Sequence, residues 1–151
     1  MSERLRIIPK KKFEIVKKRF EILGISDETP LSAIGPITKG GLVPESREDL
    51  ANLVEASLLE ACLVLFDKNI KTISSSANNG DIVAGKAYVI IDYGSLNERN
   101  KDIARTFGDV YVFHGSIDVP AVNLEIRVDK NTKVGQIRKA ALAIVEKFEQ
   151  Q

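Results

Sequence analysis

The sequence predicts an α+β fold: a two-layer sandwich in which a four-stranded antiparallel or mixed sheet carries helices packed on one face. Apolar residues recur at helical spacing near both ends and in the middle of the chain, and they alternate strictly with polar residues over 122–129. Shorter apolar runs between these segments are bounded by Gly, Asn and Ser. The expected element order is ααββαββα, in one domain whose 151 residues can bury a hydrophobic core.

Four helices are expected, three of them from long apolar stripes. The first covers about residues 10–23, and Gly24 is a suitable stop. The second runs from about Arg47 to Asp67, opened by a capping-box-like pair of Ser46 and Asp49. Ser95 and Glu98 have capping-box spacing before a shorter helix that ends near Gly108. The last helix starts near residue 131 and continues to about Phe148.

Four strands are expected, over residues 70–76, 86–93, 109–114 and 122–129. The alternation in the fourth strand indicates one buried and one solvated face. If the second and third strands are neighbours, the helix between them forms a right-handed crossover and the pair is parallel.

The formal net charge of +1 results from cancellation between two segments. Residues 1–20 hold eight basic and two acidic side chains, whereas residues 21–67 hold two basic and nine acidic ones. A basic N-terminal arm and helix (1–24) therefore precede an acidic segment that begins with a Pro/Gly-rich loop (25–45). The arm suggests nucleic-acid binding through phosphate contacts; the alternative is a solvated helix face that packs on the acidic segment. Its candidate contacts are Lys10, Lys11, Lys12, Lys17 and Lys18.

A Ser/Asn-rich loop follows the first expected strand, in the sequence SSSANNGD. Hydroxyls, amides and backbone N–H groups at the end of a strand can form an anion-binding nest. The alternative is a solvated turn marked by Asn79-Gly80. The candidate ligand-binding residues are Ser74, Ser75, Ser76, Asn78 and Asp81.

Two residues at strand ends are candidates for acid–base catalysis. His114 has a side chain whose ordinary pKa lies near neutrality, and Asp92 could act as a base beside it. Alternatively, Asp92 satisfies backbone donors in the following turn, and His114 is an edge residue without chemistry. Cys62, on the apolar side of the second helix, is expected to serve packing.

A single cysteine and a single histidine exclude an internal disulfide and a Cys/His metal cage within one chain. A carboxylate-rich site for Mg or Ca stays possible, but no EF-hand or P-loop spacing is present, and neither a metal nor a cofactor is expected. The N-terminus lacks the apolar core of a signal peptide, and the longest apolar stretch is too short to span a bilayer. We therefore expect a cytoplasmic protein without membrane contact. The apolar stripe of the last helix could pair two copies, and a homo-oligomer is expected.

The layout of the basic helix, Lys39-Gly40, the long helix and then Thr72-Ile73-Ser74-Ser75-Ser76 resembles that of the wybutosine-synthesising tRNA methyltransferase family. That family carries a Ser-Ser-Cys-Ser-Gly-Arg type signature after a similar helix. Here Ser76 stands in place of the cysteine, and Asn78-Asn79 replace the Gly-Arg pair. The resemblance implies an RNA-linked role and transfers no catalytic residue.

Together these patterns predict a small cytoplasmic binding or interaction domain, with anion or nucleotide binding through the Ser/Asn-rich loop. Two alternatives stay open. One is an enzyme acting on a nucleotide or RNA-type anion with His114 as acid–base, and the other is RNA or DNA binding through the basic arm.

Overall fold

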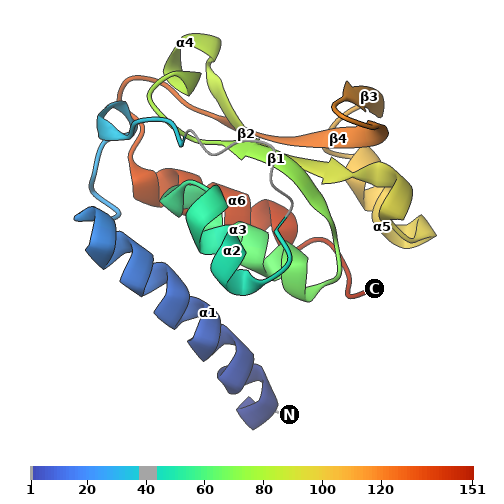
Figure 1. Cartoon of the computed structure of the whole chain (residues 1–151), viewed down its shortest axis with the longest axis horizontal. Helices are drawn as coiled ribbons and strands as arrows, with labels where there is room; N and C mark the ends of the chain where they lie inside the picture. The colour runs from blue at the N-terminus through green and yellow to red at the C-terminus, as the bar shows by residue number, and fades with distance from the viewer. Residues whose placement is uncertain (1, 38–43) are drawn as a thin grey trace.

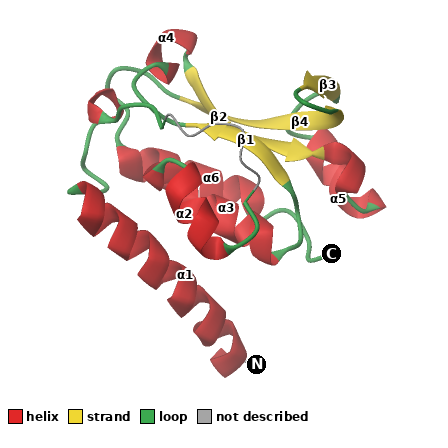
Figure 2. Cartoon of the chain, in the orientation of Figure 1, coloured by secondary structure: helices red, strands yellow, loops and turns green. Residues whose placement is uncertain are grey.

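The computed structural model describes the backbone of residues 2–37 and 44–151, with side chains from residue 13 onward in these ranges. It confirms the α+β class: helices pack on a four-stranded antiparallel sheet (Figures 1 and 2). The helices are α1 (Ser2–Leu23), α2 (Arg47–Leu53), α3 (Ala56–Asp67), α4 (Asp81–Ala84), α5 (Glu98–Arg105) and α6 (Val134–Val145). The strands are β1 (Thr72–Ser76), β2 (Lys86–Asp92), β3 (Tyr111–His114) and β4 (Asp118–Arg127). Two 3-10 turns, η1 (Leu31–Ala33) and η2 (Tyr93–Ser95), complete the elements.

The strand order is β1-β2-β4-β3, and each neighbouring pair is antiparallel. The expected crossover between residues 86 and 114 does carry helix α5, but β4 lies between β2 and β3. The parallel pairing of the second and third strands, which the sequence left possible, is therefore wrong. β1 and β3 form the two edges of the sheet.

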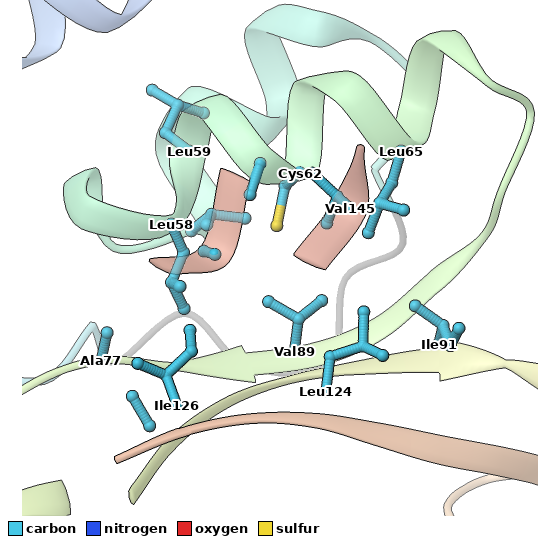
Figure 3. Packing of buried hydrophobic residues seen from close by; sticks show 14 of the residues in the cluster. Leu58, Leu59, Cys62, Leu65, Ala77, Val89, Ile91, Leu124, Ile126 and Val145 are labelled. Carbon is cyan, nitrogen blue, oxygen red and sulfur yellow. The ribbon is translucent and has the colours of Figure 1, made fainter. Parts of the chain in front are cut away.

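Helices α3 and α6 cover one face of the sheet, and α1 packs against α3 on the side away from the strands (Figure 1). The strict alternation in 122–129 is confirmed, since Val122, Leu124, Ile126 and Val128 are all buried. Figure 3 shows how Leu124 and Val89 point from the sheet toward Cys62 and Val145. Burial is the main cause that raises the pKa of the Cys62 thiol to about 12, so the expected packing role holds.

The long helix expected over 47–67 is wrong in one respect, because it is two helices. Val54 and Glu55 have extended ψ angles of 137° and 142°, which separate α2 from α3. Leu50, Val54 and Leu58, which the sequence placed on one apolar stripe, are all buried in the core on both sides of this break. Ser46 caps α2 as expected, accepting from Asp49 N at 3.1 Å. In contrast, α5 is capped by Asn97, which accepts from Asn100 N, and Ser95 instead donates to the Asp92 carbonyl.

The segment after α1 is held against the start of α6. Leu31 N donates to Thr132 O, Val134 N to Thr29 O and Gly135 N to Asp27 O, each at 2.9 Å. A Cβ on Gly135 would lie 2.7 Å from Asp27 Cβ, so this approach requires glycine. The expected Pro/Gly-rich loop is thus a bound segment over residues 25–34; its later part, residues 38–43 with Lys39-Gly40, lies outside the described residues.

Candidate functional site

The Ser/Asn-rich loop uses all the backbone donors that made it a candidate anion nest. Ala77 N donates to Glu55 Oε1 at 2.8 Å, and Asn78 N donates to Asp81 Oδ2 at 2.8 Å. The N–H groups of Asn79, Gly80 and Asp81 bond to Ile34 O, Asn78 Oδ1 and Asn78 O, respectively. These five N–H groups are bonded to oxygens of the chain itself, so an anion would have to displace those oxygens in order to bind them. Anion binding by this loop stays a prediction.

Glu55 is the residue that the sequence analysis overlooked in this region. It is 5% exposed, and its Oε1 accepts from Asn78 Nδ2 at 3.0 Å as well as from Ala77 N. The break between α2 and α3 places Glu55 at the N-cap of α3, but its side chain forms no cap and reaches the loop instead. Burial is the largest cause of the raised pKa of Glu55, and the two hydrogen bonds oppose it.

Asp81 is the second carboxylate of the loop. Its Oδ2 accepts from Ser76 Oγ at 2.7 Å and from Asn78 N. Both carboxylates thus act as internal acceptors that fix the loop at the end of β1. The predicted ligand residue Asp81 has a structural role in this arrangement.

Beside the loop lies a hollow of about 310 Å³, which we call the serine hollow. It contains the predicted ligand residues Ser74, Ser75, Ser76 and Asn78, together with Thr72 and Tyr88. Its opposite wall comes from Pro36, Ile37, Pro44 and the α2–α3 junction, Leu53 to Glu55. The structure therefore brings four of the five predicted ligand residues to one cavity.

A second hollow of about 200 Å³, which we call the arginine hollow, lies on the other side of Glu55. Its wall is built by the end of α1, the segment 25–37, and the starts of α3 and α6. The lining residues are Arg19, Leu23, Ile25, Ala33, Ile34, Gly35, Ile37, Glu55, Ala56, Ser57 and Val134.

The arginine hollow holds polar groups that have no partner among the described residues. Ser57 is 4% exposed and its Oγ makes no hydrogen bond there; Arg19 Nε is buried and equally unpaired. Within the described part of the chain, no ion pair includes Arg19. The side chain of Glu55 does not cap α3, and Ala56 and Ser57, the first two residues of this helix, line the hollow, so their N–H groups are further candidate donors.

Arg19 is one of the eight basic residues of the segment 1–20, and no sequence pattern singles out Ser57. The available signal was a hydroxyl residue in the first turn of a helix that is apolar over 56–66 apart from Ser57 and Glu60. The position of the hollow depends on tertiary contacts that local patterns do not report. Arg138 is central to these contacts, because it binds the Asp27 carboxylate through Nε and Nη2 (3.0 and 2.8 Å) and Glu60 through Nη1 (2.8 Å). The hydrogen bond from Arg138 is the largest cause of the lowered pKa of Asp27.

The predicted acid–base residues are not assembled into one site. His114 lies on edge strand β3, opposite Asp118 on β4, and its Nδ1 is 3.0 Å from Asp118 Oδ1. Asp92 pairs with Ala121, three positions along β4 from Asp118 and one strand away. The serines lie on the opposite edge, three strand spacings or about 14 Å from β3. A proton relay needs hydrogen-bond reach or one bridging water, which this sheet order does not provide.

The basic arm is helical from Ser2, and Lys17 and Lys18 are exposed on it. The side chains of Lys10, Lys11 and Lys12 lie outside the described residues. The acidic segment forms its described ion pairs with Arg47, Lys133 and Arg138. These pairs connect the acidic segment to itself and to α6. Nucleic-acid binding by the arm stays a prediction.

In the described part of the chain, no group of three or more His, Cys, Asp or Glu side chains is placed to hold a metal ion. No helix there combines the length and the apolar character needed to cross a membrane.

Comparison with known proteins returned no match: neither a family model, nor a curated protein, nor a solved structure matches the chain. The likeness to the wybutosine-synthesising family rests on the residues quoted above. Lys39-Gly40, which belong to it, lie outside the described residues.

Proposed function

We propose that the chain is a small binding domain for an anionic ligand, and that the anionic group occupies the arginine hollow. The observation that carries this proposal is a pair of donors, Ser57 Oγ and Arg19 Nε, which are buried without a partner among the described residues and belong to residues that line one hollow. Buried polar groups are nearly always hydrogen-bonded, and an exception is commonly satisfied by a ligand, ion or water. A guanidinium, a hydroxyl and an uncapped helix start all favour a negatively charged partner.

An anionic ligand was also expected from the sequence, but there it was assigned to the Ser/Asn-rich loop. We assign its anionic group to Arg19, Ser57 and the start of α3. In the Ser/Asn-rich loop, Glu55 and Asp81 already accept the hydrogen bonds that an anion would need. Among the described residues that line the arginine hollow, Glu55 is the one acidic residue and Arg19 is the one basic residue. The difference in available donors favours the arginine hollow.

Titration with inorganic phosphate, followed by amide chemical shifts, tests the proposal. We expect saturable shifts at Ala56, Ser57 and Leu58, at the start of α3. Arg19→Gln should weaken phosphate binding about tenfold, because a charge-assisted hydrogen bond is lost. Ser57→Ala should weaken binding by a smaller factor.

Lys18→Gln is the matched control, since Lys18 is an exposed neighbour with the same charge and does not line the hollow. If Arg19→Gln and Lys18→Gln change phosphate affinity equally, phosphate responds to the general charge of α1 and the proposed site is overturned. Shifts confined to residues 77–81 would return the anion to the Ser/Asn-rich loop.

A further inference from the structure

The two hollows adjoin at the junction of α2 and α3. Leu53, Val54 and Glu55 line the serine hollow, while Glu55, Ala56 and Ser57 line the arginine hollow. Ile37 also lines both hollows. Five consecutive residues of one backbone segment therefore line the two hollows in turn, with Glu55 common to both.

The serine hollow differs chemically from its neighbour. Among the residues that the structure describes, its polar lining consists of hydroxyls, one amide and the Glu55 carboxyl, and no basic side chain. A second anionic group is disfavoured there because it would face Glu55 without a compensating cation among the described lining residues. Neutral groups that both donate and accept hydrogen bonds match this wall.

Several of these hydroxyls are available to a ligand. Ser76 donates to Asp81, but the side chains of Thr72, Ser74, Ser75 and Tyr88 form no hydrogen bond with the described residues. Ser74 and Ser75 lie on β1, an edge strand that pairs only with β2 in the described sheet. Because successive side chains of a strand point to opposite faces of the sheet, Ser74 and Ser75 offer one unpaired hydroxyl on each side of this edge strand.

We propose that the ligand is a hydroxylated anion of the sugar-phosphate or sugar-acid class. Its anionic group is held by Arg19, Ser57 and the start of α3, and its hydroxyls bind the edge of β1 at Ser74 or Ser75. This inference rests on the proposed function, because it assigns the uncharged part of the same ligand. Hollows of about 310 and 200 Å³ side by side provide the space of a typical small-molecule site.

Three probes test the inference on the full chain: inorganic phosphate, ribose and ribose 5-phosphate, each titrated and followed by amide chemical shifts. Ribose 5-phosphate should bind about tenfold more tightly than phosphate, which corresponds to one or two added hydrogen bonds. Its shifts should extend from Ala56–Leu58 to Ser74–Ser76. Gluconate compared with acetate repeats the measurement with a carboxylate, and a gain in either pair supports the hydroxylated-anion class.

The double variant Ser74→Ala/Ser75→Ala should abolish the gain of the sugar over its parent anion and leave phosphate binding unchanged. Ser116→Ala, an exposed serine on the β3–β4 connection, controls for loss of a hydroxyl elsewhere. Far-UV circular dichroism verifies that each variant is folded.

Two negative outcomes are distinguishable. Equal affinities of phosphate and ribose 5-phosphate, or a sugar gain that survives in the double variant, overturn this inference and leave the anion site standing. Absence of any phosphate effect that depends on Arg19 overturns the proposed function as well.

Discussion

The Ser/Asn-rich loop and the arginine hollow lie on opposite sides of Glu55 and differ in how their polar groups are used. In the loop, five successive N–H groups are bonded to oxygens of the chain. In the hollow, a hydroxyl and a guanidinium nitrogen are buried without a partner among the described residues. A polar sequence motif can therefore mark a loop that is held rigid by its own carboxylates, while the unsatisfied groups lie where the motif is absent.

The largest expected effect concerns Glu55, because it holds the loop in place. Glu55→Ala removes the acceptor of two buried donors, Ala77 N and Asn78 Nδ2. Each unsatisfied buried donor costs about 1–3 kcal/mol, so we expect the free energy of unfolding to fall by about 3 kcal/mol. Glu55→Gln keeps an amide oxygen as acceptor and should lose less. Urea denaturation followed by circular dichroism gives both values.

Glu48→Ala, an exposed acidic residue of α2, serves as the control and should change stability by less than about 0.5 kcal/mol. A Glu55→Ala variant as stable as this control would show that the two loop donors find other acceptors. The contrast between a satisfied loop and an unsatisfied hollow would then lose its basis.

The strands and the class of the fold were predictable because their signals are local. Alternation over 122–129 reports a half-buried strand whatever the rest of the chain does, and Leu124 and Ile126 are buried as expected. The division of the 47–67 helix at Val54–Glu55 was not predictable, since it depends on the contact of Glu55 with Ala77 and Asn78. The insertion of β4 between β2 and β3 is likewise a matter of sheet order, which spacing along the chain does not determine.

For the candidate site too, residues close in sequence were predictable, whereas residues brought together by the tertiary fold were not. Ser74, Ser75, Ser76 and Asn78 reach one hollow because they are close in sequence at the end of one strand. Arg19 and Ser57 line the same hollow because α1 packs on α3 and residues 25–34 are held at the start of α6. His114 and Asp92, chosen for their chemistry alone, are separated by the strand order.

Stability as a function of pH provides a second, smaller effect at Glu55. Its pKa is raised in the folded protein above the ordinary value near 4.5, mainly by burial. Below pH 4.5 the carboxyl is protonated in both states, and this contribution to stability is fully present. As the pH rises through the folded pKa, the unfolded state has already released its proton, and the contribution is lost.

The difference in unfolding free energy between the natural chain and Glu55→Gln isolates this effect, because glutamine does not titrate. We expect the natural chain to lose stability relative to Glu55→Gln as the pH rises above 4.5. Asp27, whose pKa is lowered, acts in the opposite direction at lower pH and is common to both proteins. A difference that stays constant with pH, or that rises, would contradict a buried Glu55 carboxyl.

The smallest expected effects come from replacing one serine by alanine in each region, Ser76 in the Ser/Asn-rich loop and Ser57 in the arginine hollow. Ser76 Oγ donates to Asp81 at 2.7 Å, so Ser76→Ala should lower the free energy of unfolding by about 1 kcal/mol. Ser57→Ala removes a buried hydroxyl that has no described partner, so without ligand it should leave stability unchanged or raise it by up to about 1 kcal/mol. Thermal unfolding of both variants, with and without phosphate, shows whether each substitution lowers or raises the stability of the protein.

Phosphate should restore an advantage to the natural chain, because a ligand that binds only the folded state stabilises it by an amount that grows with its affinity. The stabilisation by phosphate should therefore be larger in the natural chain than in Ser57→Ala, and unaffected by Ser76→Ala. If Ser57→Ala lowers stability as much as Ser76→Ala in the absence of any anion, then Ser57 Oγ already makes a favourable bond in the free protein. In that case the two regions satisfy their polar groups alike, and the arginine hollow is a packing defect rather than a binding site.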